Sequence, residues 1–115
     1  MSDPWAFIAE ALVDHPLVTV EDLQAEVDAG AATLWTGERS AVFTRITGSV
    51  CECAPAGGDL AEILGPGREA IEAWAQERGC TQILIQAGRD GWARALAPYG
   101  YEQVAVVLRK TLRWV

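Results

Sequence analysis

Apolar residues in the first part of the chain recur at the spacing of a helix. In PWAFIAEALV they repeat every three to four residues, and the leading proline suits a first helical turn. The next stretch, TVEDLQAEVDAG, begins with a capping pattern and carries a second apolar stripe at the same spacing. These patterns predict two helices, the first ended by Pro16 and the second by Gly30.

After Gly30 the apolar period changes to that of strands. Three short segments, 32–35, 41–46 and 50–54, are separated by the turn sequences TGER and TG. Strands joined by such tight turns pair with their neighbours along the chain. This region therefore predicts an antiparallel meander of three strands.

The second half of the chain alternates helix and strand. The glycine-rich turn GDLAEILGPG leads into an amphipathic helix that Gly79 ends, and TQILIQA follows with an apolar run typical of a strand buried on both faces. RDGWARALAPYG predicts a short helix, and YEQVAVVLRKTL a long final strand. We predict one α+β (mixed α/β) domain over residues 1–115, in which the meander is followed by a strand–helix–strand unit with helices on both sheet faces.

Charge and composition narrow the function classes. The formal net charge is −7, and cations cluster only in the tail sequence LRKTLR, which argues against binding to nucleic acid. No apolar run reaches 18 residues, and the N-terminus is acidic, so neither a membrane span nor a signal peptide is expected. We therefore expect a soluble, acidic protein of the cytoplasm.

The cysteines offer little for a metal site. CEC places Cys51 and Cys53 on one face of a strand, but a four-coordinate metal needs more ligands, and the single histidine, His15, is distant in sequence. An odd count of three cysteines without an export signal indicates reduced thiols. We expect packing cysteines, Cys80 included, and no metal.

A resemblance to a known family rests on two stretches. ILGPGREAIEAWAQERGCTQILI, followed by GWARALAPYGYEQVAVVLRKTL, resembles the GNAT N-acetyltransferases, and the order of elements is similar over nearly the whole chain. The resemblance implies that the turn before the central helix, Gln/Arg-x-x-Gly-x-Gly/Ala in the family, holds the pyrophosphate of acetyl-CoA on backbone N–H groups. The aligned residues here are 62–67, which makes Gly65, Gly67 and the adjacent Arg68 candidate cofactor-binding residues.

This turn departs from the family pattern. Glu62 is an acid where the family has a cation or an amide, Asp59 adds a second negative charge, and Pro66 lacks an N–H. A like charge beside a phosphate costs a few kcal/mol at an effective dielectric of ~20, and a missing hydrogen bond to a charged group about 1.5–3 kcal/mol. We favour a structural interpretation: both acids begin the helix, Pro66 sets its first φ, and Gly67 permits close helix–sheet packing.

The resemblance also implies catalytic positions. The family's tyrosine that protonates the departing thiolate falls near Leu96 here, and Tyr99 is the nearest candidate, at the helix end and more typical of a core residue. Glu52, an acid inside a meander strand, is a candidate general base, although a solvent-facing strand residue is the interpretation we favour.

Five tryptophans in 115 residues suggest an interaction role. Trp74 lies on the apolar face of its helix, whereas the burial of Trp35 is undecided. Trp5 and Trp114 lie near the two termini, where a large aromatic side chain needs something to bury it. They are possible anchors for a protein partner or for self-association; packing on their own domain is the alternative.

The final strand also bears on interactions. If it is a sheet edge, its cations protect it from non-specific pairing or dock an acidic partner; they are Arg109, Lys110 and Arg113.

Three functions follow as hypotheses. The favoured one is a GNAT-like domain with an eroded acyl-CoA site and no cofactor, acting as a structural or interaction protein; the chain is similar to short GNAT-like proteins that tailed phages encode beside virion genes, which implies a host cytoplasm or virion location. The second is an acetyl-CoA-dependent N-acetyltransferase with an atypical pyrophosphate turn. The third is a non-catalytic binder of a small molecule or peptide in the cleft between diverging strands.

Overall fold

The computed structural model describes residues 3–13, 18–86 and 91–112. The chain begins with two helices and a meander, which are α1 (Pro4–Leu12), α2 (Val20–Asp28), β1 (Thr33–Thr36), β2 (Ser40–Thr47) and β3 (Val50–Gly58). It continues through α3 (Leu60–Glu62), the π-helical turn η1 (Ile63–Gly67), α4 (Arg68–Glu77), β4 (Gln82–Ile85), α5 (Gly91–Leu96) and the 3-10 turn η2 (Ala97–Tyr99).

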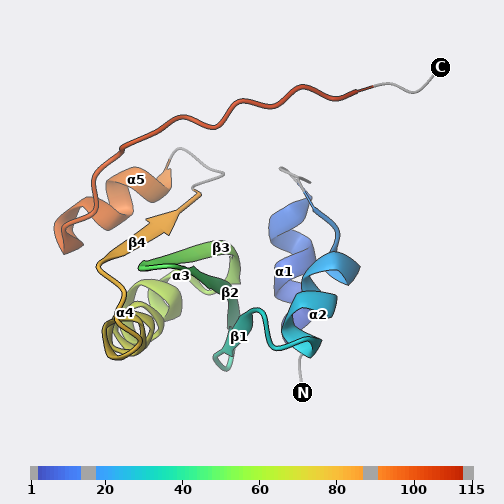
Figure 1. The fold of residues 1–115 in the computed structure, drawn as a ribbon, viewed down its shortest axis with the longest axis horizontal. Coiled ribbons are helices and arrows are strands. Elements are labelled where there is room, and N and C mark those ends of the chain that lie inside the picture. Colours follow the sequence, from blue (N-terminus) through green and yellow to red (C-terminus); the bar gives the residue numbers. More distant parts are fainter. Residues whose placement is uncertain (1–2, 14–17, 87–90, 113–115) are drawn as a thin grey trace.

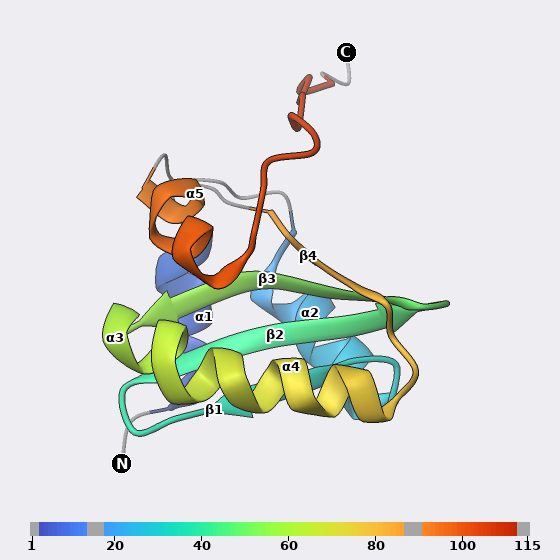
Figure 2. The same ribbon diagram turned by 90° about the vertical axis from the view of Figure 1, so that its left-hand side faces the viewer.

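The four strands form one mixed sheet in the order β1-β2-β3-β4 (Figure 1). The first three are antiparallel neighbours, whereas β4 pairs with β3 in parallel, Val50 opposite Gln82 and Cys53 opposite Ile85. The predicted meander and the mixed α+β fold class are thus confirmed. In Figure 2 the helix α4 crosses one face of the sheet and α1 and α2 lie behind the other.

Local signals account for the start of the two N-terminal helices. The helix α1 begins at Pro4, directly after Asp3. The carboxylate of Asp3 accepts a hydrogen bond from the Trp5 N–H at 3.0 Å and so caps the helix. At α2 the predicted capping box forms, because Thr19 Oγ1 accepts from the Asp22 N–H at 3.1 Å and Asp22 accepts from Thr19. Pro16, predicted to end the first helix, lies outside the described residues.

Alternation along β2 divides the core between the two faces. Ala41 and Phe43 are buried with Ile8 and Leu23 of the N-terminal helices. Val42 points to the other face, where the second cluster of buried residues also contains Cys51, Cys53, Ile63, Ile71 and Ala75. A period of two is what a strand between two helical layers requires, so the apolar pattern alone positions α4 opposite α1 and α2.

The tryptophans mostly pack within the domain. Trp35, whose burial the sequence left open, packs on the α4 side and meets Trp74 edge to face at 5.3 Å between ring centroids. Its indole N–H donates to Thr44 Oγ1 at 3.2 Å. Trp5, in α1, is half-buried against the cluster that contains Ile8 and Leu23, and its role as an anchor for a partner stays a prediction. Trp114 lies outside the described residues.

The predicted final strand is not formed, which is the main correction to the fold. Residues 101–112 pair with no strand among the described residues and run away from the body as an extended segment (Figures 1 and 2). Leu84, predicted to be buried, is 41% exposed. Ile83 and Ile85 pack on the α4-side core, and the alternation of the strand places Leu84 on the other face of this edge strand.

In the part of the chain that the structure describes, no helix has the length and apolarity needed to cross a membrane.

Candidate functional site

The glycine-rich turn lies inside a continuous helical segment and does not precede it. The helix begins at Leu60, directly after Asp59, whose carboxylate accepts the Glu62 N–H at 3.0 Å. Asp59 and Glu62 are thus helix-start acids, as predicted. Pro66 does not set the first helical φ, which corrects that prediction, because it lies six residues into the helical segment.

The π-helical turn is a consequence of Pro66. Within an α-helix, a proline lacks the N–H that should be donated and its ring collides with the carbonyl four residues back. A wider π turn relieves that collision, and here the Arg68 N–H reaches back to the Ile63 carbonyl oxygen. The backbone of Gly65 to Gly67 is therefore wound into the helix. A Cβ at Gly67 would lie 3.1 Å from the backbone carbonyl oxygen of Glu62. This glycine therefore relieves crowding within its own helix, and not against the sheet as predicted.

Arg68, the cation nearest the turn, is fully engaged by protein groups. Its Nε donates to the Leu64 carbonyl oxygen at 2.8 Å, and Nη1 lies 3.1 Å from both carboxylate oxygens of Glu72. The guanidinium also stacks on the Tyr99 ring, 3.9 Å from its centroid. With only 15% of its side chain exposed, Arg68 is held against the helix and directed away from solvent.

Glu72 joins α4 to the segment that follows α5. Besides Arg68 it binds Tyr101, whose hydroxyl donates to Glu72 Oε2 at 2.8 Å. Burial and this carboxylate raise the pKa of the Tyr101 phenol well above its ordinary value. Tyr99 is 46% exposed and does not face the core as predicted. Sequence reasoning missed Tyr101 as a functional residue, although Tyr101 lies in the stretch GWARALAPYGYEQVAVVLRKTL that carries the family resemblance.

Glu62 fastens the helix start to the hairpin between β1 and β2. Its Oε1 accepts the Arg39 N–H at 3.1 Å and the Ser40 hydroxyl. A Cβ at Gly37 would overlap the same carboxylate, so the hairpin closes directly on it. Asp59 adds an ion pair with Arg39 at 3.4 Å. Glu62 thus supplies the acceptor for the hairpin's N–H and hydroxyl groups, and its negative charge opposes the binding of an anion at the same place.

Glu52, the candidate base, belongs to an ion-pair row on the sheet. It lies 3.4 Å from Arg45, its partner in strand register, and Arg45 is held by Glu26 of α2 at 2.7 Å. The hydrogen bond to Glu26 raises the pKa of Arg45 further, so the cation is permanent. Glu52 is half exposed and faces away from Cys51 and Cys53, which lie on the α4 side.

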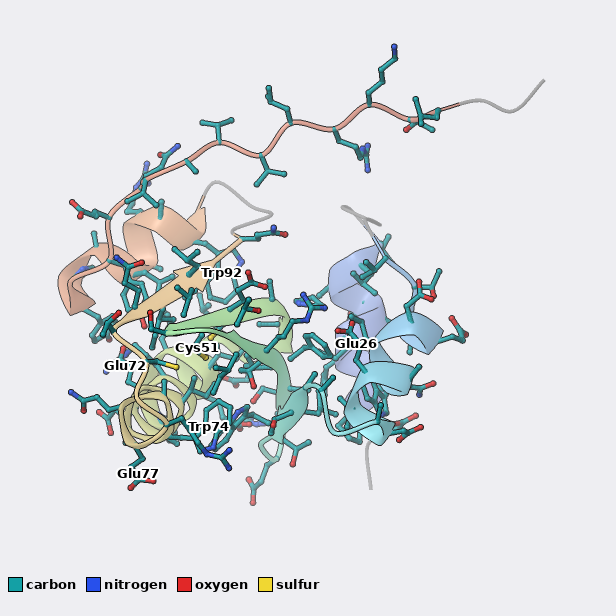
Figure 3. The ribbon with its side chains drawn as sticks, viewed as in Figure 1. Glu26, Cys51, Glu72, Trp74, Glu77 and Trp92 are labelled. Carbon is teal, nitrogen blue, oxygen red and sulfur yellow. The ribbon has the colours of Figure 1, made fainter. Side chains whose placement is uncertain are left out.

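The two strand cysteines lie side by side in the core. Their sulfur atoms are 3.9 Å apart beneath α4, where Figure 3 labels Cys51. Burial raises the pKa of the Cys53 and Cys51 thiols, which disfavours the thiolate that binds metals or attacks substrates. Cys80 is half-buried against the same cluster. Within the described ranges, no group of three or more His, Cys, Asp or Glu residues is placed to hold a metal.

An open cleft of about 460 Å³ lies between α4 and the unpaired side of β4. Its lining residues are Glu72, Ala75, Gln76, Cys80, Thr81, Gln82 and Ile83. Three of these residues belong to α4 and the rest to the segment that leads into β4 and to β4 itself, so the turn at Gly65 and Gly67 does not line the cleft. In Figure 3 the labelled Glu72 lies on this side of α4 and Trp74 on the side toward β1.

Comparison with known proteins supports the fold. The chain matches no protein-family model and no curated protein. Among solved structures it is similar to an acetyltransferase from Trypanosoma brucei, with a TM-score of 0.59 and 10% identity over 91% of this chain and 88% of the other. It is also similar to a presumed acetyl transferase from Pyrococcus furiosus, with a TM-score of 0.56 and 18% identity over 90% and 89% of the two chains. The chain thus has a GNAT-like fold.

Proposed function

We propose that this chain is a GNAT-like domain that does not bind acyl-CoA at its glycine-rich turn and acts as a non-catalytic structural or interaction protein. The observation that carries the proposal is the winding of Gly65 to Gly67 into a helix that starts at Leu60. A phosphate needs several free N–H groups directed at it. Here the free end of the helix is eight residues before Arg68 and already holds the carboxylate of Asp59.

Electrostatics work in the same direction. A phosphate approaching the helix start would have to displace Asp59 from the Glu62 N–H or lie beside it, at a cost of a few kcal/mol at an effective dielectric of about 20. Arg68 could offset this only by leaving Glu72 and Leu64. These terms together correspond to a loss of two or three orders of magnitude in affinity.

The candidate catalytic groups are also engaged elsewhere. Glu52 is paired with Arg45, and Tyr99 stacks on Arg68. Tyr101 donates to Glu72, and its raised pKa makes it a poor proton donor to a thiolate. Each of these candidate groups therefore already has a partner within the protein.

The test is calorimetric titration of the 115-residue chain with acetyl-CoA and with CoA. We expect no saturable binding below about 1 mM. A micromolar dissociation constant in the wild type that is lost in Gly67→Glu would overturn the proposal, because that substitution places an acid and a side chain on the turn itself. Circular dichroism of both proteins checks that the variant is folded.

A second candidate function is acetyl transfer with an atypical cofactor turn, which the similarity to acetyltransferases favours. A radiolabelled acetyl-transfer assay against a panel of primary amines tests it directly. The third, a binder without chemistry, would use the cleft beside β4. A place in the host cytoplasm or in a phage virion stays a prediction, which co-purification with virions would test.

A further inference from the structure

The segment after Tyr101 is extended, apolar and exposed. We call residues 102–112 the arm. Its large apolar side chains are strongly exposed: Val104 70%, Val106 72%, Val107 58%, Leu108 89% and Leu112 71%. Both faces of the central run VAVVL are apolar, which is typical of a strand with neighbours on both sides and cover on both faces. An extended chain of this composition is a hazard to solubility unless something pairs with it.

Within the described residues, the sheet of the body has an unpaired edge at β4. β4 pairs with β3 on one side only, and among the described residues nothing pairs with its other side. Leu84 stands exposed on this edge strand, and its neighbours Gln82 and Ile83 line the open cleft between α4 and β4. One chain therefore carries both an unpaired strand edge and an unpaired apolar segment.

Charge favours contact between the arm and the body. The tail 101–115 carries three cations against a single acid, in a chain whose formal net charge is −7, so the remaining residues are strongly acidic. The net attraction therefore draws Arg109 and Lys110 of one arm toward the acidic body of a second copy.

The root of the arm is fixed while the arm itself projects. Tyr101 is tied to Glu72, and beyond it the chain extends clear of the body in both views (Figures 1 and 2). Eleven extended residues span about 35 Å, as much as a principal extent of the whole molecule, 46 × 35 × 28 Å. An arm of that reach, held away from its own sheet, is placed to meet another copy.

We propose that two copies of this chain exchange their arms, each arm adding as a strand to the free β4 edge of the other. Reciprocal exchange about a two-fold axis satisfies both edges and both arms at once and leaves no open end for further growth. The proposal goes beyond the proposed function and does not depend on it, since a dimer could form whether or not CoA binds.

The first experiment measures mass by light scattering after size exclusion. We expect two chains per particle for the full chain and one for a chain ending at Gln103, which keeps Tyr101 and its bond to Glu72. Val106→Pro should raise the dimer dissociation constant about ten- to a hundredfold, because proline removes a ladder donor. Glu38→Ala, an exposed change between β1 and β2 and outside both the arm and β4, should change it by less than about threefold. A monomeric full chain, or a shortened chain that stays dimeric, would refute the exchange.

A crosslinking experiment separates exchange from closure of the arm on its own sheet. Leu84→Cys protein is mixed with proteins that carry one cysteine in the arm, Val104→Cys, Val106→Cys or Leu108→Cys, all in a Cys80→Ala background. We expect a disulfide-linked heterodimer for at least one pair. If the mixtures give none while the two cysteines on one chain form an internal disulfide, the arm belongs to its own β4 and the proposal fails.

Discussion

Glu62 is the residue whose removal tests most directly why the cofactor turn is closed. Its carboxylate accepts the Arg39 N–H at 3.1 Å and the Ser40 hydroxyl, and it lies in the first turn of the helical segment that begins at Leu60. Two substitutions separate its roles. Glu62→Gln keeps the shape and one acceptor oxygen but removes the charge, whereas Glu62→Ala removes both.

The magnitude follows from the two bonds. A hydrogen bond to a charged group contributes about 1.5–3 kcal/mol when buried. The bond from Arg39 is exposed and counts near or below the low end, whereas Ser40 is 5% exposed and would be left without its acceptor. We therefore expect Glu62→Ala to lower the free energy of unfolding by about 2–4 kcal/mol. Glu62→Gln should cost about 1 kcal/mol, because neutral hydrogen bonds are roughly half as strong.

Urea unfolding followed by tryptophan fluorescence measures this loss, since the Trp35–Trp74 pair lies beside the hairpin in the core. With a denaturant slope of about 1–2 kcal/mol per molar, the alanine variant should unfold 1–3 M earlier, roughly. All proteins are compared at one concentration, because association adds to apparent stability. Ser40→Ala and the double variant complete a cycle whose coupling should be at least about 1 kcal/mol.

Two results would refute the reasoning. If Glu62→Ala unfolds within about 0.5 kcal/mol of wild type, or if its effect adds fully to that of Ser40→Ala, the hairpin does not depend on this carboxylate. If Glu62→Gln gains micromolar affinity for CoA, negative charge alone closes the turn. We expect no gain, because Gly65 to Gly67 remain wound in the helix in this variant.

Further changes test other contacts. Tyr101→Phe should cost about 1 kcal/mol by thermal unfolding, with circular dichroism as the readout. Because the folded state raises the pKa of Tyr101 above 10.0, its contribution is fully present below pH 10 and is lost as the pH rises further, so wild type should lose more stability than Tyr101→Phe between pH 9 and 11, roughly. Gly57→Ala should lower the free energy of unfolding by at least about 2 kcal/mol, because the added Cβ would overlap the Phe7 carbonyl oxygen. Gly65→Ala serves as the control: its Cβ would have nothing within 4 Å, so it should be neutral or stabilising by up to about 1 kcal/mol. Equal effects of the two substitutions would contradict the packing argument.

Local signals in the sequence were enough to predict most elements. The capping box at Thr19, the turns of the meander and the alternation along β2 all act within a few residues of one another. The helix start was misplaced because Pro66 is typical of a first helical turn. What overrides this preference is distant in sequence: Glu62 is held by Ser40 of the hairpin, which fixes the helical turn before the proline.

For the predicted final strand, the sequence indicates the backbone conformation but not the pairing partner. Its β-branched composition correctly predicts an extended backbone, but pairing requires a neighbour that the composition does not specify. The exposure of Leu84 was missed because the apolar run Ile83-Leu84-Ile85 does not specify which face of the strand is covered, and only the face of Ile83 and Ile85 packs on the core. Tyr101 escaped notice for a similar reason, because its partner Glu72 lies 29 residues away.

The contacts around Glu72 connect the closed turn with the projecting arm. Arg68 is the cation closest to the turn, and it neutralises the carboxylate to which Tyr101 anchors the arm. A phosphate that recruited Arg68 would leave Glu72 with its charge uncompensated beside a half-buried phenol, and so would weaken the support of the arm's root. One arginine cannot serve both anions. The 2.8 Å hydrogen bond of Arg68 to the Leu64 carbonyl oxygen and its stacking on Tyr99 hold it beside Glu72, which supports the root of the arm. The same contacts that withdraw the cation from a cofactor therefore hold the segment we assign to association.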